Sequence, residues 1–221
     1  MLIWAKKSEV DIEVINPIAK MYRENLRTKN LGNILKAWEL SVIFRQIKRY
    51  FGDRKDISIL DFGAGASPFG AYLNHLGYQD VTCLDKKGSW HPKMNEGRYN
   101  ENYNASVRYV ITDIRSDYNA EHDVIFSASV IEHIEEDERI DIMHALARHL
   151  ASGGLLIHVV DYEAGVNFKE LIDNCGIPIS YNPKITPGCR EFSGVPKYTW
   201  WTAHKRMRII TRVAFFNKKI K

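Results

Sequence analysis

The residues best suited to chemistry lie in one short segment, residues 59–70, which read ILDFGAGASPFG. Gly63 and Gly65 permit positive φ angles and let a ligand approach the backbone closely. Ser67 is suited to cap a helix, and Pro68 is suited to the first helical position. The N-terminus of that helix would present unpaired N–H groups and a partial positive charge. We therefore expect a strand, a glycine turn and a helix start that hold a nucleotide-like cofactor.

Two aspartates downstream make this glycine turn more specific than a lone G-x-G. Asp85 follows an expected strand about 20 residues after the turn, where a carboxylate typically holds a ribose diol. Asp113 follows the next expected strand, where a polar group can meet a base. Ligands of open parallel sheets bind beyond the carboxyl ends of the strands. The turn and both carboxylates are thus expected to face one ligand.

A nicotinamide dinucleotide is the obvious competing ligand, and two residues argue against it. The dinucleotide fingerprint G-x-G-x-x-G places its third glycine where this chain has Pro68. Asp61 adds a negative charge just before the turn, where it would repel a pyrophosphate. An amino acid that carries an ammonium and a sulfonium tolerates that charge. These departures favour S-adenosylmethionine over NAD.

Hydrophobic periodicity predicts alternating strands and helices around these residues. Short apolar strands separated by helices indicate a mostly parallel sheet that is covered on both faces. Residues 177–206 look like a loop. The expected helices are residues 33–51, 67–76, 137–150 and 168–174, and the expected strands are residues 58–62, 80–84, 107–112, 123–127, 155–160 and 208–216.

Length and composition are those of one α/β domain of 221 residues. No apolar run approaches the roughly 20 residues that span a bilayer, and no signal peptide is apparent. The three cysteines are scattered, which favours a reduced, cytoplasmic protein. The net charge of +4 is only mildly basic, with basic residues gathered near the C-terminus. Nucleic-acid binding usually needs a broader basic face, so an RNA partner is not favoured.

The chain resembles the class I S-adenosylmethionine-dependent methyltransferases from about residue 57 to residue 160. ILDFGAGASPFG is similar to their first motif, VTCLD to the second, YVITDI to the third, DVIFSASVIEHI to the fourth and GGLLIHVVD to the fifth. Ser67 departs from the pattern, since many members have a third glycine there. The resemblance implies a Rossmann-like, doubly wound α/β/α sandwich. Its seven-stranded sheet would be mostly parallel, with an antiparallel last strand.

The resemblance also implies a cofactor-binding set at the ends of the strands. The backbone around Gly63 and Gly65 would pass the methionine part of the cofactor. Asp61 would face the amino group of that part. The whole set consists of Asp61, Gly63, Ala64, Gly65, Ser67, Asp85, Lys86, Asp113, Ile114, Ser127, Ala128 and Ser129.

Within this set, the resemblance assigns roles to the other strand ends. Asp85 would bind both ribose hydroxyls. Asp113 would meet the exocyclic amine of adenine, and Ile114 would add its backbone N–H and an apolar face. Residues 127–130 would line the cavity near the sulfonium.

His133 and Asp161 are the catalytic candidates. His133 follows the fourth expected strand, and the ordinary pKa of histidine suits a general base. The alternative for His133 is packing beside the cofactor or capping the next helix. For Asp161 two roles stay open, facing the acceptor or capping a loop. His158 lies inside an apolar strand and is expected in the core. No metal is expected, because Ser129 stands where metal-dependent RNA methyltransferases of this superfamily have the first glutamate of E-x-x-E-H.

The expected function is methyl transfer to a small-molecule acceptor, at oxygen or nitrogen. An RNA or protein acceptor, or a non-catalytic cofactor-binding protein, remains an alternative, and the oligomeric state is open. Residues 1–52 would form a helical segment. Trp38 and Glu39 of this segment would close over the cofactor, with core packing as the favoured alternative for Trp38. Residues 53–161 would form the cofactor-binding core, and residues 162–221 the acceptor side and last strands. The aromatics of that last region would form an acceptor pocket or cover the sheet edge: Tyr162, Phe168, Tyr181, Phe192, Tyr198, Trp200 and Trp201.

Overall fold

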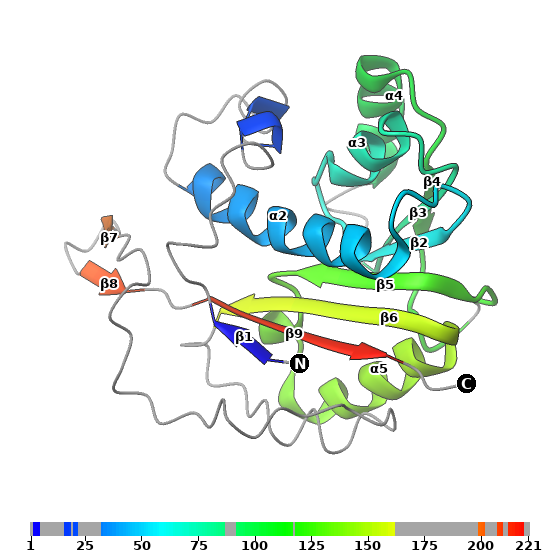
Figure 1. Ribbon diagram of the computed structural model, residues 1–221. Coiled ribbons are helices and arrows are strands. Elements are labelled where there is room, and N and C mark those ends of the chain that lie inside the picture. The colour runs from blue at the N-terminus through cyan, green and yellow to red at the C-terminus, as the bar shows by residue number, and fades with distance from the viewer. Residues whose placement is uncertain are drawn as a thin grey trace.

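The protein is an α/β sandwich built on one twisted sheet, as the computed structural model in Figure 1 shows. The structure describes residues 2–4, 16–18, 20–21, 32–86, 92–116, 118–161, 199–201, 207–209 and 212–218. The expected helix at 168–174 and the aromatic residues at 162, 168, 181, 192 and 198 lie outside these ranges. The backbones of Trp200 and Trp201 are described within a strand.

Five strands form the parallel part of the sheet and carry the motifs: β2 (Ser58–Phe62), β3 (Asp80–Asp85), β4 (Arg108–Ile111), β5 (His122–Ala128) and β6 (Leu150–Asp161). β9 (Arg212–Lys218) runs antiparallel to β6, and β1 (Leu2–Trp4) runs antiparallel to β9. In the described residues, the strand order is β1-β9-β6-β5-β2-β3-β4. The predicted α/β fold with a mostly parallel sheet is confirmed.

Two features of the sheet differ from the sequence expectation. The expected single strand at residues 208–216 is wrong, because that stretch contributes to β8 (Met207–Ile209) and to β9. β8 pairs with β7 (Thr199–Trp201) in a separate two-stranded sheet. The stretch RIITRVAFF contains no glycine or proline, so its sequence does not mark the change of pairing partner. β1 was not predicted, because three residues are too few for a periodic signal.

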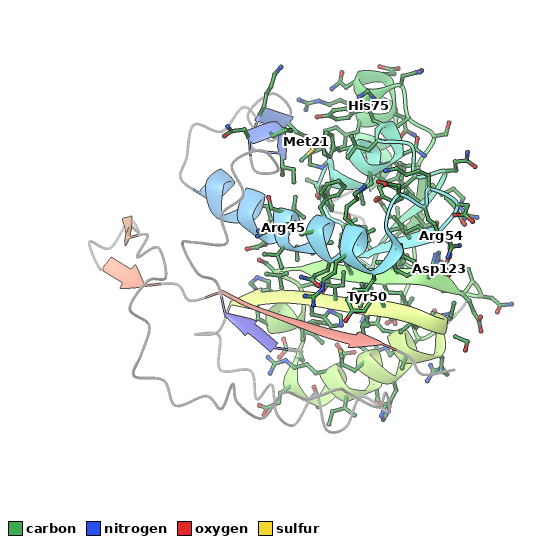
Figure 2. The ribbon with its side chains drawn as sticks, in the orientation of Figure 1. Met21, Arg45, Tyr50, Arg54, His75 and Asp123 are labelled. Carbon is green, nitrogen blue, oxygen red and sulfur yellow. The ribbon has the colours of Figure 1, made fainter. Side chains whose placement is uncertain are left out.

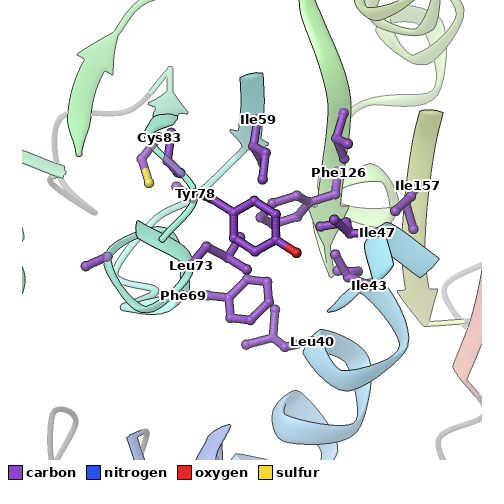
Figure 3. Close-up of a cluster of buried hydrophobic side chains, with 14 of the residues drawn as sticks. Leu40, Ile43, Ile47, Ile59, Phe69, Leu73, Tyr78, Cys83, Phe126 and Ile157 are labelled. Carbon is purple, nitrogen blue, oxygen red and sulfur yellow. The ribbon is translucent and has the colours of Figure 1, made fainter. Parts of the chain in front are cut away.

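In the part of the chain that the structure describes, one face of the sheet is covered by α2 (Gly32–Phe51), α3 (Phe69–His75) and α4 (Pro92–Tyr103). Ile43 of α2, Phe69 of α3 and Phe126 of β5 are fully buried in a common cluster, which Figure 3 shows. α2 and α3 were expected. α4 was missed because its sequence, PKMNEGRYNENY, is polar and carries few apolar residues at helical spacing.

The opposite face is covered by α5 (Glu136–Arg148), an expected helix. Ile142, Met143 and Leu146 of α5 pack with Leu60 and Leu156 of the sheet in a second cluster. The helices therefore lie on both faces, as in a doubly wound sheet. None of the helices in the described residues combines the length and the apolar character that a bilayer crossing requires.

The amino ends of the central strands are closed by polar contacts. The backbone N–H of Ser58 donates to Asp123 Oδ2 at 2.9 Å, and the N–H of Asp123 donates to Ser58 Oγ at 3.1 Å. Figure 2 shows Asp123 and Arg54 close to each other at this end of the sheet. These bonds fix the register of β2 against β5. The opposite, carboxyl ends hold the residues singled out by the sequence.

Candidate active site

The glycine turn folds back over the end of β3. Gly63 and Gly65 have φ angles of 71° and 50°, as the sequence predicts for a turn at this position. The N–H groups of Gly63 and Ala64 donate to Leu84 O at 2.8 and 3.1 Å. The N–H of Gly65 donates to Asp85 Oδ2 at 2.9 Å. Asp85 thus anchors the turn as well as standing at the expected ribose position.

The helix that follows the turn begins slightly later than expected. Its first residue is Phe69, and Pro68 occupies the capping position, so Ser67 is not the N-cap. Ser67 Oγ nevertheless accepts a hydrogen bond from the N–H of Phe69 at 3.2 Å. Tyr99 of the unpredicted helix α4 supports the turn, because its hydroxyl donates to Ala66 O at 3.0 Å.

Asp61 is a buried carboxyl group at the end of β2, only 4% exposed. Its Oδ2 has no hydrogen-bond partner among the described residues. Burial raises the pKa of Asp61 to about 8, although the positive charge of Lys36 acts in the opposite direction. A buried acid of this kind gains a partner when an ammonium group lies beside it. Asp61 therefore fits the amino group of an amino-acid ligand.

Asp113 lies in a dense ion-pair cluster rather than facing a ligand alone. Its Oδ1 accepts from the backbone N–H and the Nε of Arg115 at 2.9 and 3.0 Å. Its Oδ2 lies 2.7 Å from Arg115 Nη2 and 3.2 Å from Lys86 Nζ. Glu138 of α5 closes the cluster, 2.7 Å from Arg115 Nη2. Hydrogen bonds from Arg115 hold the pKa of Asp113 well below its usual range.

The ion pairs of this cluster occupy the carboxylate of Asp113 that was expected to bind adenine. An adenine amine would have to share Asp113 with two cations, so a simple meeting of amine and carboxylate is not what the geometry presents. Ile114 is only 2% exposed and packs in the cluster on the α5 face. Sequence reasoning missed Arg115 and Glu138, although an Asp-x-Arg spacing signals a local ion pair.

The residues at the end of β5 divide into a buried and a surface part. Ser127 is fully buried, and its Oγ lies 2.6 Å from Nδ1 of His158, which is also fully buried. The prediction that His158 is a core histidine is confirmed. This contact directs the Ser127 side chain toward β6. The role of Ser127 in lining the cofactor cavity stays a prediction. Ala128 and Ser129 are half-buried.

The central part of the chain is similar to a known family of domains. Residues 59–154 match the family model described as "Methyltransferase domain". This match and the methyltransferase structures that share the fold support S-adenosylmethionine-dependent methyl transfer, with S-adenosylmethionine as the cofactor.

Solved structures of methyltransferases share the fold at low sequence identity. TehB from Haemophilus influenzae is 16% identical, with a TM-score of 0.59 over 91% of this chain and 66% of that one. A TehB-like SAM-dependent methyltransferase from Corynebacterium glutamicum is 18% identical, with a TM-score of 0.55 over 96% and 100%. A ribosomal protein L11 methylase from Lactobacillus delbrueckii subsp. bulgaricus is 16% identical, with a TM-score of 0.53 over 83% and 80%. No curated protein matches the sequence.

The two catalytic candidates of this methyltransferase lie at the same edge of the sheet. His133 is exposed at the end of a short 3₁₀ helix, Ile131–His133, and its N–H donates to Val130 O at 2.9 Å. Asp161 is the last residue of β6 and stands opposite Arg212 of β9. Among the described residues, no group of three His, Cys, Asp or Glu side chains is arranged to hold a metal ion.

Two residues of α2 also contact the end of β5: Glu39, which the sequence suggested as a residue closing over the cofactor, and Lys36, which the sequence did not single out. Lys36 Nζ donates to Ala128 O at 3.0 Å and lies 2.8 Å from Glu39 Oε2. Ser129 Oγ lies 3.1 Å from both carboxylate oxygens of Glu39. These contacts join segments about 90 residues apart in the sequence, so no local sequence pattern predicts them.

Proposed function

We propose that this methyltransferase transfers a methyl group to the oxygen or nitrogen of a small-molecule acceptor. The main support for the cofactor site is Asp61, a buried carboxyl group beside the glycine turn whose Oδ2 has no hydrogen-bond partner among the described residues. It would hold the ammonium group of S-adenosylmethionine. Asp85, already fixed by Gly65, would hold the ribose hydroxyls. The backbone from Gly63 to Gly65 would border the methionine part.

When bound, S-adenosylmethionine supplies an electrophilic methyl group on a sulfonium. The chain then has to align the acceptor with that group and keep it in place. For an oxygen acceptor, His133 would accept the acceptor's proton, since its imidazole is exposed at the carboxyl edge of the sheet. A neutral amine acceptor would not need that base.

The charges of the site support a small acceptor over RNA. Lys36, Lys86 and Arg115 are each held in ion pairs with carboxylates of the chain. A phosphate backbone would have to compete with those carboxylates for the cations. The fold similarity to a ribosomal protein L11 methylase supports a protein acceptor as the second candidate. Transfer of labelled methyl groups to small molecules, to proteins and to RNA, assayed in parallel, separates these acceptor classes.

Calorimetry with S-adenosylmethionine, S-adenosylhomocysteine and NAD tests the cofactor site. We expect both adenosyl compounds to bind and NAD not to bind. Asp85→Ala should weaken the binding of S-adenosylhomocysteine by roughly tenfold to a hundredfold, since it removes charge-assisted hydrogen bonds. Asp85→Asn keeps an oxygen acceptor for Gly65 N–H and therefore separates ribose binding from anchoring of the turn. Binding of NAD alone would refute the proposal, and unchanged affinity in both variants would refute the role of Asp85.

A further inference from the structure

Two charged residues on one turn of α2 reach across to the end of β5. Lys36 Nζ donates to the backbone oxygen of Ala128, and Glu39 accepts from Ser129 Oγ. The two α2 residues also form an ion pair at 2.8 Å. α2 is thereby attached to Ala128 and Ser129 by side-chain bonds and not only by apolar packing.

The burial of Glu39 indicates that this attachment does more than stabilise the fold. Glu39 is 0% exposed, whereas 29% of the Lys36 side chain remains exposed. Removing a carboxylate from water is costly, and a buried ion pair often contributes less stability than apolar residues of the same size. The Glu39 carboxylate therefore secures a particular position of Ser129.

Ser129 is held in a conformation that the backbone alone disfavours. Its φ angle is 55°, in the left-handed region that non-glycine residues rarely adopt. Its N–H donates to Val159 O at 2.7 Å, while its hydroxyl is held by Glu39. Such backbone strain persists only where surrounding contacts enforce it, and it is concentrated at functional sites.

The residue after Ser129, Val130, contacts the glycine turn. A Cβ atom built on Gly63 would lie 2.6 Å from both Cγ atoms of Val130, so Val130 packs directly on the turn. Lys36 also acts on Asp61, the acid beside the turn, through its positive charge. One continuous set of contacts thus joins α2, the end of β5 and the glycine turn.

We propose that Lys36 and Glu39 are positioning residues for the amino-acid end of the cofactor site, acting through Ala128, Ser129 and Val130. This inference rests on the proposed cofactor site at Asp61 and Asp85. It assigns α2, which lies outside the matched domain, to that site. It predicts that these two side chains matter for the methionine part of the cofactor and not for its nucleoside.

Two ligands separate these parts of the cofactor. S-adenosylhomocysteine carries the amino-acid part, and 5′-methylthioadenosine lacks it. Glu39→Gln and Lys36→Met should each weaken the binding of S-adenosylhomocysteine about tenfold, as expected for coupling within one hydrogen-bonded network. The binding of 5′-methylthioadenosine should stay unchanged. Lys48→Met is the matched control, because Lys48 lies on the same helix and pairs with the exposed Asp53. It should bind both ligands like the wild type.

Each outcome of the calorimetry decides between the inference and its alternatives. If the variants bind both ligands more weakly by the same factor, or bind both like the wild type, Lys36 and Glu39 have only a structural role. The inference is then overturned. If the wild type binds neither ligand, the proposed function itself fails. Should Glu39→Gln fail to fold in a thermal scan, Lys36→Met and Ser129→Ala decide the question. Each of these variants breaks the same hydrogen-bond network at a residue that is only partly buried. The inference then requires that the ratio of the two affinities changes in both variants.

Discussion

At the scale of single residues, three buried ionisable groups make the stability of the protein depend on pH between about pH 4 and 8. Burial raises the pKa of Asp61 to about 8. Burial lowers the pKa of His122 to about 4 and that of His158 to about 3. All three groups are therefore neutral in the folded protein near pH 6. In the unfolded chain their pKa values return to about 3.9 for aspartate and 6.5 for histidine.

These shifts predict opposite slopes on the two sides of about pH 6.5. Below that pH, the unfolded histidines bind protons that the folded ones do not, so stability falls as the pH drops toward 4. For Asp61, the folded state keeps a proton that the unfolded state has lost. Its contribution is complete below about pH 4 and is lost as the pH rises through 8.

Asp61→Asn should remove the loss of stability at neutral to alkaline pH. The difference in unfolding free energy between wild type and variant should change by up to about 1.4 kcal/mol per pH unit between pH 6 and 8. Denaturant titrations of both proteins at pH 6, 7 and 8 measure that difference. A difference independent of pH would mean that Asp61 is ionised in the folded, ligand-free protein.

At the scale of elements, the position of α3 depends on a glycine that sequence reasoning passed over. A Cβ atom on Gly70 would lie 2.3 Å from Cys83 Sγ of β3, so α3 packs directly on the strand. In dinucleotide-binding folds the third glycine of the fingerprint allows this close approach. Here Pro68 takes that position, and Gly70, the second residue of α3, makes the close contact.

Gly70→Ala should therefore destabilise the protein by roughly 1–3 kcal/mol through overpacking. Gly97→Ala is the matched control on α4, because a Cβ there meets no atom within 4 Å. The control should raise stability by up to about 1 kcal/mol, as alanine favours a helix over glycine. Denaturant unfolding measures both changes. Equal effects of the two substitutions would show that α3 does not depend on this close contact.

At the scale of the whole molecule, the strand order explains where the site lies. The chain runs outward from β2 through β3 to β4, then returns to place β5 on the other side of β2. The order of strands thus reverses between β2 and β5, and ligands of open α/β sheets bind at such a point. The glycine turn follows β2, and the Ala128–Ser129 segment follows β5, so both border this switch point.

Because the proposed ligand binds only the folded sheet, it should stabilise the whole molecule. At a concentration one hundred times its dissociation constant, S-adenosylhomocysteine should add about 2.7 kcal/mol. For a chain of this size that corresponds to a rise in Tm of roughly 5–10 °C. Thermal scans with S-adenosylhomocysteine, with NAD and without ligand test this. An equal shift with NAD would contradict the assigned cofactor.

The sequence by itself determined the features that depend on neighbours along the chain. Local periodicity and backbone sterics predicted the strands at 58–62 and 80–84 and the positive φ angles at Gly63 and Gly65. They also predicted that Asp85 lies at a strand end. Parallel pairing then brings the ends of these strands to one edge. The glycine turn and the carboxylates at that edge are the features from which the sequence predicted S-adenosylmethionine as the cofactor.

Only the tertiary structure decided which distant segments meet there. It placed Glu39 against Ser129, 90 residues away, and Gly70 against Cys83. It gave Asp113 to a cluster that includes Glu138, and not to a ligand alone. Such contacts depend on how the helices pack over the sheet. The type and the sequence spacing of a residue do not identify a partner that this packing brings close.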